Sequence, residues 1–168
     1  MSLFGAWHQA GILNANSISF VDTYIFNNQK DLSFSDESVK EIASEVIALE
    51  GVAFDEAAVH FVDESTICAL HKRYFDDSSP TDCISFPMDN AAEEGYKVLG
   101  EIFVCPKAAL TYAAEHKNSP YDETTLYVVH GLLHLMGYDD MNEADRAKMR
   151  KAEDRHMENL KHKGLILK

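Results

Sequence analysis

Two histidines one helical turn apart are the residues of this chain best placed to do chemistry. His130 and His134 are four positions apart, so on an α-helix they share a face and their ring nitrogens can converge on one ion. Gly137 follows where a helix end accepts a left-handed residue, which reverses the chain and lets Asp140 or Asp139 return over the last turn. Two imidazoles and a carboxylate arranged in this way predict a metal site.

The spacing His-x3-His-x2-Gly-x2-Asp also matches the zinc-binding pattern of the metzincin metalloproteases, with aspartate as the third ligand. In those enzymes a glutamate follows the first histidine and acts as the general base. This chain has Gly131 in that position. A metallopeptidase that uses the usual machinery is therefore disfavoured by a single residue.

The segment that carries the histidines has the clearest helix start in the chain, with Ser119 as N-cap and Pro120 as the first helical residue. Residues 126–136 contain no charged side chain and are apolar on nearly every side, which predicts a central, buried helix. Two buried histidines on one face would each need a partner in a low-dielectric interior. Because a shared metal ion satisfies both, ligation is favoured over two separately satisfied core histidines.

Length and composition indicate one globular domain over residues 1–168, with residues 1–15 a candidate for a loosely ordered extension. The chain has 168 residues, 46% of them hydrophobic and 26% charged, which is enough for a sizeable core. Residues 1–21 contain neither a basic leader nor an unbroken apolar run, so we expect no membrane span and a cytoplasmic protein. The three cysteines are never spaced as CxxC, which favours buried free thiols at Cys68, Cys83 and Cys105.

The net charge of -13 limits how this protein can contact nucleic acid, because nonspecific binding to phosphate is dominated by lysine and arginine. Any contact with RNA must therefore be local. Basic residues are frequent from Lys148 onward, but acidic residues are interleaved with them. A solvated helix face of mixed charge explains this pattern more simply than a basic binding surface does.

The remaining local signals predict alternating strands and helices. Strands are expected at residues 18–26, 59–62, 83–86 and 99–105. Helices are expected to begin after the N-cap residues Ser35, Asp63 and Asn142, and at Pro106. The helix after Ser35 is expected to end near Gly51, and the helix after Asp63 in the loop 76–80. The helix that begins at Pro106 is expected to end near Lys117, and the helix after Asn142 near Lys163.

Three blocks of the sequence resemble the YbeY endoribonucleases, a family of rRNA maturation factors. They are PTDCISFP at 80–87, LGEI at 99–102 and HGLLHLMGYD at 130–139, and with their spacing the resemblance covers roughly residues 35–160. It implies an α+β fold in which helices pack on a small, mostly parallel four-stranded sheet. It also implies one zinc ion in a cleft beside the sheet, action on single-stranded RNA of the ribosome or a small-subunit precursor, and a role in 16S rRNA 3′-end maturation and ribosome quality control.

Two positions depart from the family pattern. The third histidine of the family motif is Asp140 here, a legitimate zinc ligand whose charge lowers the Lewis acidity of the ion and leaves the identity of the metal open. The family arginine that precedes the Pro-Thr-Asp block, a candidate contact to phosphate, is Phe75 here. Arg73 lies two positions earlier and points nearly the opposite way on a continuous helix, so it can replace that arginine only if the helix frays.

Other residues of these blocks are candidates for supporting roles. Asp139 is a candidate to orient a ligating imidazole, with a role in capping the turn as an equal alternative. Ser85, Thr81 and Asp82 are expected near the strand that lines the cleft, although turn chemistry explains Thr81 and Asp82 at least as well. Lys107 is a candidate contact to phosphate, although an exposed lysine is usually only solvated. No residue of the metal motif is an evident general base.

Three functions remain open on the sequence alone. The favoured one is a metal-dependent endoribonuclease, in which an ion held by His130, His134 and Asp140 binds the scissile phosphate, activates water, or does both. The second is a metallopeptidase or another metallohydrolase, which would need a carboxylate base beside the metal. The third is a ribosome-assembly factor that acts by binding and holds a structural metal, which the absent third histidine and the absent arginine both support.

Overall fold

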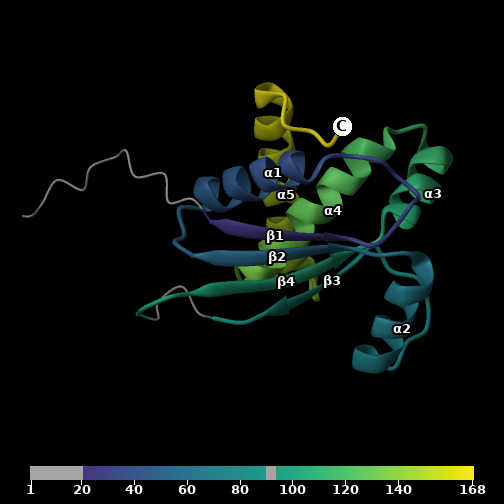
Figure 1. Ribbon diagram of the computed structural model, residues 1–168, viewed down its shortest axis with the longest axis horizontal. Helices are drawn as coiled ribbons and strands as arrows, with labels where there is room; N and C mark the ends of the chain where they lie inside the picture. The colour runs from purple at the N-terminus through teal and green to yellow at the C-terminus, as the bar shows by residue number, and fades with distance from the viewer. Residues whose placement is uncertain (1–20, 90–93) are drawn as a thin grey trace, which may run out of the picture.

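The computed structural model describes residues 21–89 and 94–168. Within these ranges the chain forms four strands and five helices (Figure 1). The strands are β1 (Asp22–Asn27), β2 (Glu56–Phe61), β3 (Cys83–Pro87) and β4 (Val98–Val104). The helices are α1 (Asp36–Glu50), α2 (Glu64–Phe75), α3 (Pro106–His116), α4 (Pro120–Leu135) and α5 (Glu143–Lys163).

The strands form one mostly parallel sheet in the order β1-β2-β4-β3. β1 and β4 both run parallel to β2, whereas β3 pairs antiparallel with β4 at the edge. The predicted α+β fold is therefore confirmed. β2 begins at Glu56 rather than at residue 59, because the small residues Ala57 and Ala58, which carry little strand signal of their own, pair with β1. Residues 18–20 of the predicted first strand lie outside the described residues.

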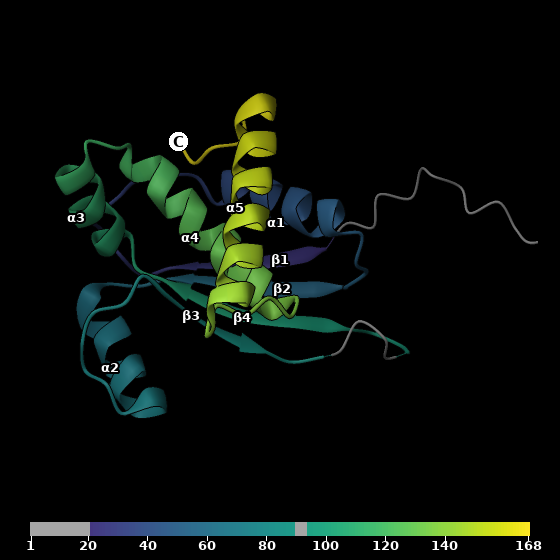
Figure 2. The same ribbon diagram turned by 180° about the vertical axis from the view of Figure 1, so that it is seen from behind.

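The helix α4 is the centre of the molecule. It packs against β3, β4, α1, α3 and α5, and in both ribbon views α1, α4 and α5 lie on one side of the sheet while α2 lies on the other (Figures 1 and 2). The side chains of Val128, Val129, Leu132 and Leu133 are completely buried, which confirms the prediction of a central, apolar helix.

Gly131 marks the point where α4 comes closest to the sheet. A Cβ atom at this position would lie 3.1 Å from Cγ2 of Ile102 on β4, which is tighter than ordinary van der Waals contact. On the same turn, the Ser85 hydroxyl of β3 donates a hydrogen bond of 3.1 Å to the Gly131 carbonyl. Glycine fits this close approach of helix and sheet, whereas a larger side chain such as glutamate would require Ile102 to shift.

Local capping sets where most of the helices begin. Ser35, Asp63, Ser119 and Asn142 each accept a hydrogen bond from the backbone N–H three residues later, as predicted from the sequence. Each such bond satisfies one of the N–H groups left free in the first turn and stabilises the helix by about 1 kcal/mol. The exception is α3, which begins at Pro106 without a side-chain cap.

The last helix, α5, is long and mostly polar. Its buried residues are Met149, Ala152, His156 and Leu160, and these pack the helix against α1 and α4 (Figure 2). One stripe of α5 therefore faces the core, while the rest of the helix faces solvent. None of the helices in the described ranges is long and apolar enough to cross a membrane.

The three cysteines are free, as predicted, but only Cys105 is buried. Cys68 and Cys83 are half-buried, so the prediction of buried thiols is wrong for these two. The reason is their place in the fold, because Cys83 lies on the edge strand β3 and Cys68 on α2, where Ile67 is the buried residue.

Candidate metal centre

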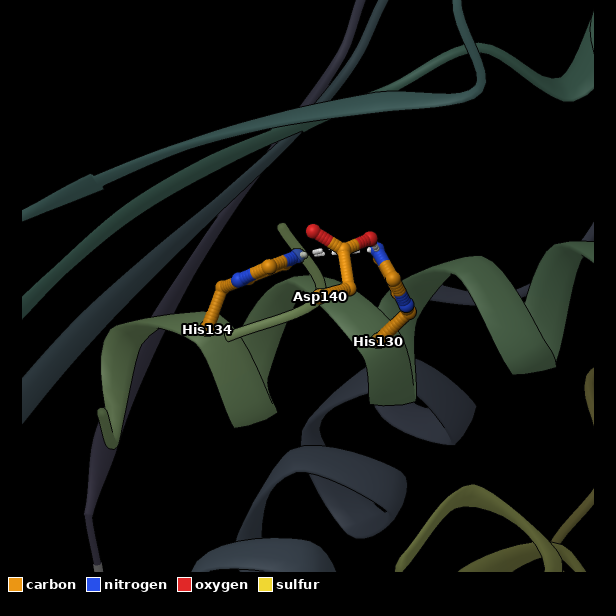
Figure 3. A group of neighbouring side chains, drawn as sticks. All are labelled: His130, His134 and Asp140. Carbon is orange, nitrogen blue, oxygen red and sulfur yellow. Dashed lines mark hydrogen bonds and ion pairs between the residues drawn. The ribbon is translucent and has the colours of Figure 1, made fainter. Parts of the chain in front are cut away.

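Among the described residues, His130, His134 and Asp140 form a group whose ligand atoms all lie within 4.8 Å of one another (Figure 3). The Nε2 atoms of the two histidines are 3.0 Å apart. Oδ2 of Asp140 lies 3.9 Å from Nε2 of His130 and 3.8 Å from Nε2 of His134. The histidines come from α4 and Asp140 from the loop after it. The structure thus brings together the three residues that the sequence singled out as metal ligands.

The loop after α4 turns back because of one glycine and one capping carboxylate. Gly137 has φ of 97°, in the left-handed region that favours glycine. Oδ1 of Asp139 accepts hydrogen bonds from the N–H groups of Asp140 at 2.7 Å and Met141 at 3.2 Å. Asp139 therefore shapes the turn that presents Asp140, the alternative role considered for it.

Each histidine is oriented through its Nδ1 atom. Nδ1 of His130 lies 2.5 Å from Oε1 of Glu153 on α5, and Nδ1 of His134 lies 3.0 Å from the backbone carbonyl of Tyr138. A carbonyl and a carboxylate are acceptors, so each Nδ1 donates a hydrogen bond and each ring turns its Nε2 outward. The two Nε2 atoms face each other across 3.0 Å. At this separation either a proton held between the two nitrogens or a metal ion bound to both satisfies the pair.

The three ligand atoms fit a divalent metal ion. Bonds of about 2.0–2.2 Å to a tetrahedral zinc ion place neighbouring ligand atoms roughly 3.3 Å apart. The separations here, 3.0 Å between the nitrogens and 3.8 to 3.9 Å from nitrogen to oxygen, bracket that value. Two imidazoles and one carboxylate are also a ligand set that iron(II) accepts, so the donor chemistry fits more than one metal.

The electrostatics of the group also favour a cation. Burial pushes the pKa of His130 down, but the hydrogen bond to Glu153 and the negative charges of Glu153, Asp82 and Asp140 outweigh it, so the pKa is raised overall. The site therefore stabilises positive charge at His130, where a proton and a metal ion compete for the same nitrogen.

The two histidines are less buried than the sequence predicted. Their side chains remain 19% and 26% exposed, because this face of α4 opens onto a cleft beside the edge strand β3. The cleft has a volume of about 350 Å³ and is lined by His71, Phe75, Thr81, Cys83, Ile84, Ser85, Pro87, His130, His134, Asp139, Asp140 and Met141. A larger hollow of about 940 Å³ lies between β1 and α1, and no histidine or cysteine is among the described residues that line it. The smaller cleft is therefore the one with metal-binding chemistry.

Two of the predicted substrate contacts lie away from this cleft. The guanidinium of Arg73 on α2 lies 5.4 Å from the centre of the Tyr74 ring, and Lys107 is exposed in the first turn of α3. Neither residue is part of the cleft wall. Ser85 does line the cleft, but its hydroxyl is already bonded to the α4 backbone. The predicted roles of Arg73 and Lys107 in catalysis and substrate binding stay predictions that this geometry does not support.

The residues before β3 form a turn at the cleft's edge. Thr81 Oγ1 donates to Oδ1 of Asp82 at 3.2 Å, and the same oxygen accepts the N–H of Cys83 at 2.8 Å. These contacts match the turn chemistry considered for Thr81 and Asp82. Burial, assisted by nearby carboxylates, raises the pKa of the Cys83 thiol well above its usual range, so it stays protonated.

Sequence reasoning missed Glu153, which contacts His130 from a helix 23 residues further along the chain. One signal could have pointed to it. Met149, Ala152 and His156 form the buried stripe of α5, and at helical spacing Glu153 lies within that stripe. A carboxylate in such a position needs a partner, although the sequence alone does not show which one.

A second missed set of contacts holds the loop that carries Asp140. The Tyr138 hydroxyl donates to Oε2 of Glu50 on α1 at 3.0 Å. The other Glu50 oxygen contacts Arg155 and, at 2.7 Å, Nε2 of the completely buried His156. Helices α1 and α5 therefore anchor Tyr138, whose backbone carbonyl orients His134.

Fold and site together define a class, a small α+β protein with a candidate metal centre on its central helix. A family model described as endoribonuclease YbeY matches residues 24–161. An endoribonuclease YbeY of Protochlamydia amoebophila is 56% identical over 142 residues, covering 84% of this chain and 95% of that protein. One of Chlamydia trachomatis serovar D is 38% identical over 133 residues, covering 78% and 83% of the two chains.

The fold comparison agrees with the sequence comparison. The solution structure of a Thermotoga maritima protein matches with a TM-score of 0.59 and 29% identity, covering 81% of this chain and 87% of that one. This chain belongs to the endoribonuclease YbeY family, as the three sequence blocks predicted.

Proposed function

We propose that this protein is a metal-dependent endoribonuclease that hydrolyses phosphodiester bonds of single-stranded RNA. The observation that carries the proposal is the convergence of two histidine Nε2 atoms, 3.0 Å apart, with the Asp140 carboxylate, a donor set that suits a divalent metal ion. Membership of the YbeY family supplies the RNA substrate class. We further propose zinc as the metal, a ribosomal small-subunit precursor as the substrate, and the cytoplasm as the place of action.

His130, His134 and Asp140 would hold the ion, and the cleft would hold the RNA strand. A bound divalent ion supplies a Lewis acid for the scissile phosphate and makes a bound water more acidic. The protein fixes both imidazoles in the tautomer that presents Nε2, and it places a carboxylate beside them. Asp140 contributes a negative charge, so this ligand set leaves the ion a weaker Lewis acid than three imidazoles would.

The cleft wall fits a single strand better than a duplex. Phe75, which takes the place of the family arginine, is 58% exposed and lines the cleft. An exposed ring of this kind can stack on an unpaired base, whose face is free only in single-stranded RNA. Among the described residues that line the cleft there is no lysine or arginine. Binding would therefore depend on the ion and on base contacts more than on neutralising phosphates.

The test combines metal analysis with cleavage of a labelled single-stranded RNA and the matching duplex. We expect the purified protein to carry stoichiometric metal, to cut the single strand and to lose this activity on chelation. Zinc should restore the activity, and a His130→Ala, His134→Ala double variant should neither hold metal nor cleave. Chelation-resistant cleavage, or equal cutting of the duplex, would contradict the proposal.

A ribosome-assembly factor with a structural metal is the second candidate. It is favoured by Phe75, which leaves the cleft without the family arginine that is a candidate contact to phosphate, and by the lack of a general base at Gly131. The same experiment separates the two candidates, because this alternative predicts tightly bound metal without cleavage. A metallopeptidase is disfavoured further by the close contact of Gly131 with Ile102, which leaves little space for the glutamate that such an enzyme needs.

A further inference from the structure

The two histidines of the metal centre are oriented by different kinds of partner. His134 bonds through Nδ1 to a backbone carbonyl, that of Tyr138, four residues along the same chain segment. His130 bonds through Nδ1 to a side chain, that of Glu153, at 2.5 Å. The orientation of His134 is thus built into the end of α4, whereas that of His130 depends on the docking of α5.

We propose that Glu153 is a positioning residue of the metal centre, which holds His130 in the orientation and tautomer that a metal ion requires. The inference rests on the proposed function for the ion itself. A carboxylate that accepts a hydrogen bond from the Nδ1–H group leaves Nε2 as the only ring nitrogen free to bind the metal. It also makes Nε2 a better electron-pair donor to the metal. It also fixes a ring that could otherwise rotate and present either edge.

The position of Glu153 suits this role. Its side chain is 17% exposed and belongs to the stripe of α5 that faces the core, next to Ala152 and His156. The neighbouring contacts of the helix keep it there, because His156 is completely buried and bonds to Glu50 on α1. Glu153 therefore reaches His130 from a helix that also has its own contact with α1.

This arrangement couples the metal centre to α5. If docked α5 favours metal binding, then metal binding must favour docked α5 by the same free energy. The helix buries few apolar side chains, so a small gain in free energy from metal binding shifts the docking of α5 measurably. We expect zinc to slow hydrogen exchange in α5, and to do so less when Glu153 is replaced.

The test compares Glu153→Ala and Glu153→Gln with the parent and with Glu158→Gln, which changes an exposed carboxylate on the same helix. Zinc affinity is measured on metal-free protein by competition with a chromogenic chelator. We expect Glu153→Ala to bind zinc about 10- to 100-fold more weakly, Glu153→Gln to lie between, and Glu158→Gln to match the parent. The visible spectrum of the cobalt(II)-substituted protein should change only for the Glu153 variants.

Thermal unfolding of the metal-free proteins separates positioning from folding. If Glu153→Ala is unstable, the isosteric Glu153→Gln decides, since it keeps the shape of the side chain. The proposal would be overturned if both Glu153→Gln and Glu153→Ala had the zinc affinity and the cobalt spectrum of the parent. It would also be overturned if zinc slowed hydrogen exchange in α5 equally in the parent and in the Glu153 variants. A parent that binds zinc but cuts no RNA would overturn only the proposed activity, whereas a parent that binds no zinc would overturn both.

Discussion

Asp140 occupies the position where the family motif has its third histidine, and its Oδ2 lies within 3.9 Å of both histidine nitrogens. Among the residues of the centre, it is the one that sets this site apart from an all-imidazole site. An anionic ligand passes charge to the ion, so water bound to that ion ionises less readily. The pH dependence of the reaction should therefore report on this single side chain.

The first prediction concerns Asp140→His. The loop after Gly137 is half exposed, so an imidazole can be accommodated without disturbing α4. The neutral ligand set makes bound water more acidic, so we expect faster RNA cleavage near neutral pH and a pH profile displaced downward by about one unit. The measurement is the rate of cleavage of a single-stranded RNA across pH, with saturating zinc.

The matched variant for this prediction is Asp140→Ala. It removes the ligand but leaves the packing of α4 intact, so metal affinity should fall while thermal unfolding of the metal-free protein stays close to that of the parent. If Asp140→Ala binds metal and cleaves like the parent, Asp140 is not a ligand, and another residue completes the site.

At the scale of elements, the sequence predicted what depends on neighbours along the chain. The caps at Ser35, Asp63, Ser119 and Asn142 were confirmed, because each is a contact between a side chain and the N–H three residues later. The convergence of His130 and His134 is likewise a local consequence of helix geometry.

Contacts between distant elements were not predictable in the same way. The bond from Glu153 to His130 depends on how α5 docks, and the cleft that exposes the histidines depends on β3 being an edge strand. The start of β2 was placed too late because Ala57 and Ala58 gain their strand conformation from pairing with β1. Tertiary packing determines all of these features, and the local sequence pattern predicts them only weakly.

The second prediction tests the close approach of α4 to the sheet. Alanine is a better helix former than glycine by about 1 kcal/mol, so Gly131→Ala would stabilise a free helix. Here its Cβ would lie 3.1 Å from Ile102, and we expect a net loss of about 1–3 kcal/mol in the free energy of unfolding. Urea unfolding of the metal-free protein measures it.

A double variant shows whether the contact with Ile102 is the cause. Ile102→Ala removes the Cγ2 and Cδ1 methyl groups of Ile102, which would lie 3.1 and 3.3 Å from the new Cβ. Of the three nearest atoms it keeps only the Cβ atom of residue 102. The double variant should then lose less stability than the sum of the two single variants, by about 0.5–3 kcal/mol. Additive losses, or a Gly131→Ala variant more stable than the parent, would show that the helix has room to move.

A row of stacked rings on β1, β2 and β4 gives the third prediction. His60 lies between Phe26 and Phe103, with ring centres 4.6 and 4.3 Å away. Its buried Nε2 has no hydrogen-bond partner among the described residues, and the carboxylate of Glu101 is 3.6 Å away. Burial lowers the pKa of His60, and the charge of Glu101 only partly opposes this.

Because its folded-state pKa lies below the unfolded value of about 6.5, His60 binds a proton more readily in the unfolded chain. Neutral His60 therefore makes its full contribution to the free energy of unfolding above about pH 6.5, and this contribution decreases as the pH falls below that value. We expect His60→Phe, which keeps the stacked ring, to lose less stability between about pH 7 and pH 5 than the parent does. Urea unfolding at both pH values measures the difference, and an equal loss would contradict the prediction.

At the scale of the whole molecule, the net charge of -13 and the distribution of cations restrict how RNA can bind. Of the seven lysines and arginines of α5, four form ion pairs with acidic side chains. Lys161 pairs with Asp122 at 2.9 Å, and Lys163 pairs with Glu45 at 2.6 Å. The helix therefore offers little net positive charge, in line with the solvated, mixed-charge face that the sequence predicted.

The last prediction follows from this balance. With no lysine or arginine among the described residues of the cleft wall, few phosphates are neutralised, so the affinity for a single-stranded RNA should depend only weakly on salt. Each neutralised phosphate of a single strand contributes about 0.7 to the slope of log affinity against log salt. Phe75→Arg places a cation in the cleft, so it should strengthen binding and steepen the slope by about that amount, whereas Lys161→Gln on α5 should leave the slope unchanged. Fluorescence anisotropy of a labelled oligonucleotide with the zinc-loaded protein gives these slopes. A steep slope in the parent that Lys161→Gln reduces would show instead that RNA binds along α5, outside the cleft.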